Sequence, residues 1–191
     1  VLLFVVTLLC LPLLTNDAYL LRILILTSIF AIFAASWDLL SGFTGQVNFG
    51  HALFFGMGAY TSAILNKSIH LAPYFSIPMG ALAAVLTGLL IGIPCLRLKG
   101  TYLALTTLAY PIILMGIVFA FPDLTGGELG ISGIERMARS RVANYYICVS
   151  IMLVLCFVMW KITDSNIGII FHAIREDELA VKAAGINTTR Y

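Results

Sequence analysis

Charged side chains are scarce in this sequence. Only 10% of the 191 residues are Asp, Glu, Lys or Arg, whereas ordinary soluble domains carry about 25%. No charged residue occurs between Asp38 and Lys67, between Lys67 and Arg97, or between Lys99 and Asp123. One helical crossing of a bilayer needs about 20 mainly apolar residues. These runs argue against a soluble domain and predict a protein embedded in membrane lipid.

A basic surface and metal-binding patterns are also missing from the sequence. The formal net charge is only +2, so the chain lacks the concentration of Lys and Arg that nucleic-acid-binding domains use, and no nucleic-acid partner is expected. The four cysteines form no CxxC pair and the three histidines are widely separated. Neither spacing is that of a metal site. We therefore expect no metal and no other cofactor.

Motifs for catalysis are absent from the sequence as well. A nucleotide-hydrolysing chain would carry the phosphate-binding pattern G-x-x-x-x-G-K-[ST], which does not occur here. A membrane enzyme would need acid, base or metal-binding side chains gathered in one place, and the apolar runs offer no such group. The sequence therefore indicates that the protein is not an enzyme.

Six apolar segments follow one another along the chain, and each is expected to form a helix. Backbone polar groups in lipid must be satisfied within the protein, and the segments lack the alternation of barrel strands. The prediction is an all-α polytopic membrane protein with about six transmembrane helices, in a single domain over residues 1–191. The segments are residues 1–14, 19–40, 50–66, 74–96, 101–121 and 142–161.

The ends of the chain indicate whether the sequence is a whole protein, and its charged links indicate which side of the membrane each link faces. The sequence starts at Val1, directly inside an apolar run, and stops soon after a polar segment. We therefore expect it to be a piece of a longer protein. Placing Arg97 and Lys99 in the cytoplasm also places residues 163–191 there. The positive-inside rule favours this direction by a thin margin only, because the basic cluster at 136–141 then lies outside.

A polar interruption at residues 38–51 divides two of the apolar segments. Three glycines in nine residues, Gly42, Gly45 and Gly50, disfavour a continuous helix by about 1 kcal/mol each relative to Ala. Broken helices with polar side chains often form the sites of transporters, so we expect a broken or re-entrant segment near 41–50. The alternative is an ordinary turn at the membrane surface. The candidate residues for lining a substrate pathway are Ser41, Thr44, Gln46 and Asn48.

Small residues recur every fourth position in the segment 74–96. Gly80, Ala84, Gly88 and Gly92 lie at this spacing, which places them on one helix face and lets a neighbouring backbone come close. The pattern predicts a helix packed tightly within a bundle. The alternative is that Gly and Ala are simply common in membrane helices.

The composition becomes polar over residues 163–191. Asp177 is placed to cap a short helix near 178–184, and Gly185 is placed to end it. A helix of two turns isn't stable alone in water, so it needs a surface to dock on, which suggests a cytosolic partner. A simple juxtamembrane linker is the alternative. The residues proposed to contact such a partner are Glu176, Asp177, Glu178, Leu179, Ala180 and Gly185.

Four motifs follow one another along the chain. They are Leu40–Ala52 with Phe54–Tyr60, Arg97–Ala104 with Thr106–Ala109, Leu124–Ile134, and Ala173–Ala180 with Ala184–Tyr191. In this order they make the chain resemble the permease family of branched-chain amino-acid ABC importers, closest to its LivM-type subunit, over about residues 19–191. One departure is that Glu178 lies seven residues before Gly185, one more than in the general coupling motif of importers.

The resemblance implies a pore-forming subunit in a prokaryotic plasma (inner) membrane that carries leucine, isoleucine, valine or a similar small amino acid. It further implies four kinds of contact: a second homologous permease subunit, two cytosolic ATP-binding subunits, an external solute-binding protein, and membrane lipid. The short polar helix near 178–184 would couple ATP hydrolysis in the partners to the pathway.

An ion-coupled secondary transporter of small polar solutes is the alternative function. Such a protein needs ionisable groups or ion sites in the middle of the membrane. Only Asp38 lies near such a position in the sequence. ATP-driven import is therefore the favoured interpretation.

Overall fold

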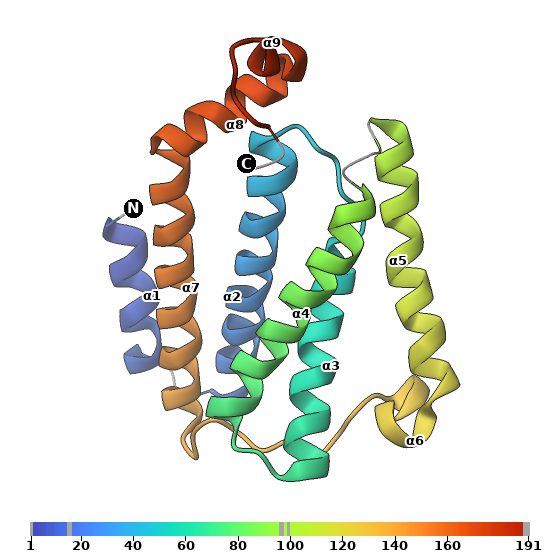
Figure 1. Ribbon diagram of the computed structural model, residues 1–191. Helices are drawn as coiled ribbons and strands as arrows, with labels where there is room; N and C mark the ends of the chain where they lie inside the picture. The colour runs from blue at the N-terminus through green and yellow to red at the C-terminus, as the bar shows by residue number, and fades with distance from the viewer. Residues whose placement is uncertain (1, 15–16, 96–97, 99, 189–191) are drawn as a thin grey trace.

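All regular structure in the residues that the computed structural model describes, 2–14, 17–95, 98 and 100–188, is helical (Figure 1). Three short helices and two single turns accompany six long helices in these residues. The long helices are α1 (Leu2–Leu14), α2 (Ala18–Asp38), α3 (His51–Ile69), α4 (Pro73–Cys95), α5 (Thr101–Ala120) and α7 (Arg141–Thr163). The shorter elements are η1 (Leu39–Phe43), α6 (Pro122–Thr125), η2 (Gly127–Leu129), α8 (Asn166–Glu176) and α9 (Glu178–Ala183).

Four of these helices are long and apolar enough to cross a membrane: α2 with its η1 extension, α4, α5 and α7. Their outer faces carry large exposed apolar side chains, such as Leu90 of α4 and Ile112 of α5. Such a surface is stable against acyl chains and unfavourable in water. The fold is therefore that of a multi-pass membrane protein, as predicted.

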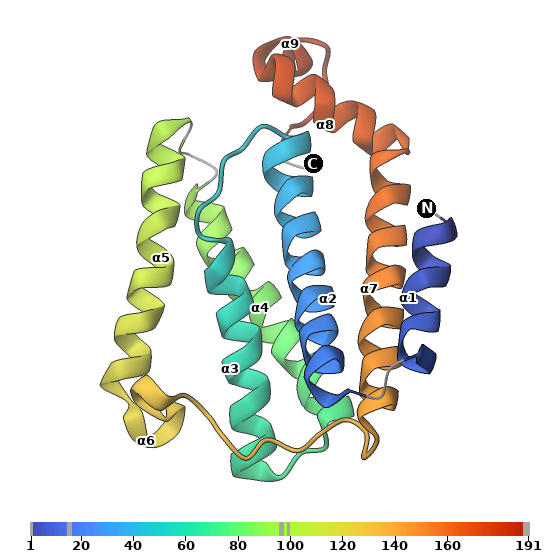
Figure 2. The ribbon, with the colours of Figure 1, turned by 180° about the vertical axis from the view of Figure 1, so that it is seen from behind.

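The expected number of about six spans needs a refinement. All six predicted helices form, but within the described residues α1 and α3 are not both long enough and apolar enough to cross a membrane. Helix α1 has 13 residues, fewer than a full crossing requires. Helix α3 carries polar residues such as Ser62, Asn66 and Lys67. Figure 2 shows that α3 starts well below the level at which α2 ends.

The helices pack mainly as two pairs. Helices α2 and α7 enclose a small core of Leu21, Tyr145, Val149 and Met152. Helix α1 lies on the outer side of α7 (Figures 1 and 2), where the Tyr145 hydroxyl donates to the Leu8 carbonyl at 2.7 Å. Helices α3 and α4 form the second pair, and α5 stands beside α3.

The pairing of α3 with α4 depends on a close backbone approach. A Cβ atom added at Gly80 would lie 2.4 Å from the Gly58 carbonyl oxygen of α3, and one added at Gly58 would lie 3.7 Å from the Ala84 Cβ. Further along the stripe, Gly88 faces the ring of Phe54, and a Cβ at Gly92 would meet nothing within 4 Å. The stripe therefore comes close to the α3 backbone only in its first half.

The two ends of the bundle differ. We call the end that carries α8 and α9 the coupling end and the end that carries α6 and the 130–140 connection the opposite end (Figure 1). Polar contacts fix the connection: the Glu135 amide donates to Asn66 Oδ1 at 2.9 Å, and the Tyr74 hydroxyl donates to the Met137 carbonyl at 2.9 Å. The connection is thus held against the ends of α3 and α4.

Candidate functional site

The helix predicted to break near 41–50 is broken between Leu39 and Gly50. Helix α2 passes into the π-helical turn η1, an irregular stretch follows, and α3 begins at His51. We call residues 39–50 the broken segment. Within it, a Cβ at Gly42 would lie 2.3 Å from Asp38 Oδ1, and Gly45 has a φ of +71°. The positive φ at Gly45 therefore favours glycine, whereas at position 42 the flexible Asp38 side chain could turn away from a larger residue. Single π turns of this kind recur at functional sites.

The broken segment goes deeper than an ordinary surface turn. The Phe49 amide donates to Thr107 Oγ1 of α5 at 3.1 Å, and a Cβ at Gly50 would lie 2.8 Å from the Thr107 carbonyl oxygen. Thr107 lies six residues inside α5, which corresponds to about 9 Å along the helix axis. The segment therefore runs down beside α5 and places polar backbone below the end of the bundle.

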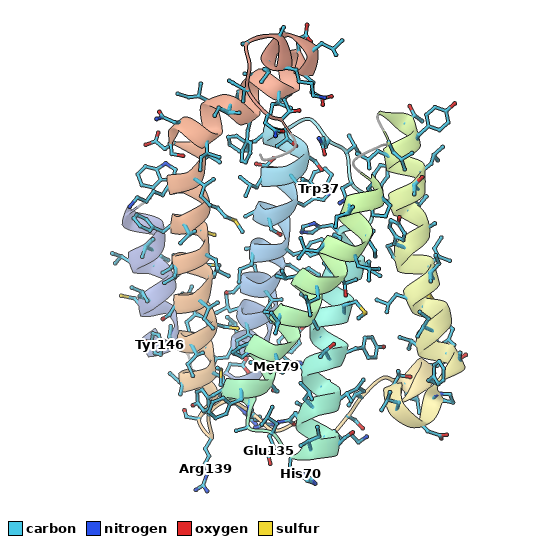
Figure 3. All side chains as sticks on the ribbon, in the orientation of Figure 1. Trp37, His70, Met79, Glu135, Arg139 and Tyr146 are labelled. Carbon is cyan, nitrogen blue, oxygen red and sulfur yellow. The ribbon has the colours of Figure 1, made fainter. Side chains whose placement is uncertain are left out.

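Helix α2 anchors the same segment from its other side. The Trp37 indole donates to the Asn48 carbonyl at 2.9 Å, near the coupling end (Figure 3). The Asn48 side chain accepts from the Gly50 amide at 2.7 Å, and Ser36 Oγ lies 2.7 Å from His51 Nε2. These contacts hold the irregular backbone in place from the side of α2.

Two cavities flank the broken segment at the coupling end. The first, of about 490 Å³, lies between the segment, the start of α5 and the α8–α9 pair. The second, of about 410 Å³, lies between the segment, α4, α5 and α9. Gln46 and Glu178 line both cavities. The broken segment and the short terminal helix therefore face the same space.

The four predicted pathway residues fall in different places. Thr44 lines the first cavity, Asn48 the second, and Gln46 both. Ser41 lines neither of these cavities, and its hydroxyl is buried with no hydrogen-bond partner among the described residues. The structure therefore brings three of the four candidates to cavity walls and places Ser41 within the packing of η1.

The short terminal helix forms where the sequence predicts it. Asp177 Oδ1 accepts from the Leu179 amide at 2.8 Å and from the Ala180 amide at 3.1 Å, so it caps α9. The helix ends before Gly185, which has a φ of +85°. The side chain of Leu179 is 70% exposed. This side chain is therefore accessible on the surface of α9.

Helix α8 joins α9 to the broken segment. Arg175 Nη1 donates to the Gly42 carbonyl at 2.6 Å, and a Cβ at Gly45 would lie 2.9 Å from Arg175 Cγ. The rings of His172 and Phe43 lie 5.1 Å apart between centroids. A movement of α8 and α9 must therefore move or break contacts with residues 42–45.

Two residues that contact the broken segment, Arg175 and Thr107, could not be predicted as site residues from the sequence. Arg175 and Thr107 lie inside two of the quoted motifs, yet nothing in their spacing distinguishes them from their neighbours. Arg97 and Lys99 of the second motif, and residues 189–191 of the fourth, lie outside the described residues. No group of three or more His, Cys, Asp or Glu residues that could hold a metal ion occurs in the described part of the chain.

Comparison with known proteins identifies the class of molecule. Residues 19–191 match the family described as the permease component of branched-chain amino acid transport systems. The chain belongs to this family, whose members are components of transporters rather than enzymes. The match extends over the broken segment, both cavities and α9.

Two curated relatives are each described as the high-affinity branched-chain amino acid transport system permease protein LivM. The protein of Escherichia coli is 31% identical to this chain over 194 residues, and that of Salmonella typhimurium is 28% identical over 194 residues. Each alignment covers 86% of this chain and 46% of the relative. The chain therefore spans about half the length of the curated relatives it matches. No solved structure matches it.

Proposed function

We propose that the chain is part of the permease subunit of an ATP-driven ABC importer that carries branched-chain or similar small amino acids across a prokaryotic inner membrane. The observation that carries this proposal is the contact between α8 and the broken segment, because it connects α9, with its exposed Leu179, to the cavities. Family membership and the relatives' described substrates support the same conclusion.

The broken segment supplies groups suited to a zwitterion. Thr44, Gln46 and Asn48 present neutral side chains that donate and accept hydrogen bonds at the cavity walls. An unpaired charge at this depth would be costly, whereas neutral groups can bind both an ammonium and a carboxylate group and release them again. These three residues are therefore proposed to line the pathway.

The α8–α9 pair is proposed to transmit the energy of ATP hydrolysis. Leu179 would dock on one of two cytosolic ATP-binding subunits, flanked by Glu176, Glu178 and Ala180. A second homologous permease subunit would complete the pathway, and an external solute-binding protein would deliver the amino acid at the opposite end. Movement of α9 would then reach Gly42 through Arg175.

A disulfide crosslink tests the docking assignment. In the assembled transporter, with native cysteines replaced, a cysteine at Leu179 is expected to crosslink to a cysteine on the ATP-binding subunit, because this side chain is exposed on α9. The matched control is Leu129→Cys, which is 96% exposed at the opposite end and is expected to give no crosslink. Absence of the Leu179 crosslink in a complex that transports would overturn the assignment.

Substitutions of Gln46 and Ser41 test the pathway. Gln46→Leu is expected to lower kcat/KM for amino-acid uptake by about tenfold, the effect of one or two lost hydrogen bonds. Ser41→Ala is expected to stay within about twofold, because loss of an unpartnered buried hydroxyl is nearly neutral. Uptake of radiolabelled leucine into proteoliposomes measures both. Equal effects of the two changes would contradict the assignment of Gln46.

The same proteoliposomes separate ATP-driven import from ion-coupled transport. Uptake is expected to require ATP on the side of the ATP-binding subunits and to persist after ionophores collapse the proton and sodium gradients. Uptake that follows an ion gradient without ATP would establish the secondary transporter instead.

A further inference from the structure

A groove at the opposite end of the bundle is not used by the proposed pathway. It has a volume of about 930 Å³ and lies between α2, α7, the start of α4 and the 130–140 connection. Its walls are built from one face of each of the two long helices, at the spacing of three and four residues typical of a helix side. The apolar lining includes Ile25, Ile29 and Ile32 of α2 and Ile147 and Ile151 of α7.

Three arginines line the same groove. Arg22 comes from α2, Arg136 from the connection, and Arg141 is the first residue of α7. The described residues that line the groove include no Asp or Glu. Sequence positions that are far apart are thus brought together into a site with three positive charges beside a wall of isoleucine.

The arginines project from backbone that is held in place. Asn144 accepts from the Ala138 amide at 3.0 Å and donates to the Ala138 carbonyl at 2.7 Å and the Ser140 carbonyl at 2.9 Å. The Tyr74 hydroxyl bonds the Met137 carbonyl from α4. The stretch between Arg136 and Arg141 is therefore tied at both of its flanks, so the backbone that carries these two arginines is held at the mouth of the groove.

The dimensions of the groove match one leaflet of a bilayer. From Arg141 to Ile151 along α7 the distance is about 15 Å, at 1.5 Å per residue. One half of a hydrocarbon core about 30 Å thick has the same extent. The charged mouth thus lies at the level of headgroups when the isoleucine walls lie among acyl chains.

We propose that this groove binds an anionic phospholipid. Its phosphate lies among Arg22, Arg136 and Arg141, and an acyl chain lies along the isoleucine walls. A lipid is favoured over a membrane helix because one lipid molecule joins a phosphate, which matches the three arginines, to an acyl chain, which matches the apolar walls. The proposal also accounts for a basic cluster on the side that the positive-inside rule disfavours, since the bound headgroup neutralises it.

Native mass spectrometry of the intact transporter in detergent tests this inference. Phosphatidylglycerol is added to the delipidated complex, and its dissociation constant is compared with that of phosphatidylcholine. Arg22→Gln, Arg136→Gln and Arg141→Gln are each expected to weaken phosphatidylglycerol binding about fivefold, the effect of one basic residue near a membrane surface. Subunit composition, read in the same spectra, shows whether each variant still assembles.

Arg139→Gln is the matched control. It removes the same charge from the same connection, but Arg139 does not line the groove and points away from the bundle (Figure 3). Its phosphatidylglycerol binding is expected to stay within about twofold of the unchanged protein. Glycerol phosphate, the free headgroup without acyl chains, is expected not to displace the lipid.

Three results would overturn the proposal. One is equal lipid binding by the three groove variants and the control. Another is displacement of the lipid by glycerol phosphate, which would make the groove a site for a soluble anion. The third is unchanged lipid binding with weaker affinity for the solute-binding protein, which would assign the arginines to a protein contact. None of these readouts depends on the transported substrate, so the inference can fail while the proposed transport function stands.

Discussion

Arg175→Ala is expected to reduce ATP-driven amino-acid uptake by more than tenfold while the transporter still assembles. The change removes the only described hydrogen bond from the Arg175 side chain to the broken segment, the 2.6 Å contact with the Gly42 carbonyl. Hydrogen bonds to charged groups contribute about 1.5–3 kcal/mol, which corresponds to a factor of ten or more in the equilibrium that they control. Uptake and ATP hydrolysis are measured together in proteoliposomes.

The two activities of the Arg175 variant should separate. ATP hydrolysis is expected to persist, because α9 and its cap at Asp177 are unchanged, whereas uptake per ATP falls. Arg175→Lys is the conservative control and should restore part of the uptake, since an ammonium group can donate one bond to the same carbonyl. A variant that keeps normal uptake per ATP would show that movement reaches the pathway by another route.

Gly80→Ala is expected to destabilise the permease by about 2 kcal/mol or more, within the range for overpacked interiors. The added Cβ would lie 2.4 Å from the backbone oxygen of Gly58, and backbone can't move aside as a flexible side chain can. Helices α3 and α4 must therefore separate, which also loosens the walls of the second cavity. Thermal unfolding followed by size-exclusion chromatography in detergent measures the change.

Gly92→Ala is the matched control on the same helix. A Cβ at this position would meet nothing within 4 Å, and Ala is the better helix former by about 1 kcal/mol. The stability of this variant is expected to be unchanged or slightly higher. Equal destabilisation of both variants would contradict the close contact at Gly80. It would indicate that the glycines of α4 act through the flexibility of this helix and not through its packing against α3.

Much of the fold could be predicted from the sequence because its signals are local. Long apolar runs bounded by polar or glycine-containing links place each helix to within a few residues: segment 74–96 becomes α4 at Pro73–Cys95, and segment 142–161 becomes α7 at Arg141–Thr163. The start of α9 is placed to the residue because Asp177 is a strong capping side chain.

The candidate site was less predictable, because its geometry depends on contacts between distant segments. Composition cannot separate Gln46, which lines both cavities, from Ser41, which is buried in η1. The bond from Arg175 to Gly42 joins residues 133 positions apart. The grouping of Arg22 with Arg136 and Arg141 likewise results from the packing of α2 against α7, which no spacing in the sequence encodes.

Proline inside α5 has a consequence for the wall of the second cavity. Pro111 has no amide hydrogen, so it can't donate the usual helical bond to the carbonyl four residues earlier, which is that of Thr107. Gly50 approaches this same oxygen closely enough that a larger residue would clash with it. A kink-prone position on one helix thereby leaves the Thr107 carbonyl without its usual helical donor at the wall of the second cavity, where only a residue as small as Gly50 can pack against it.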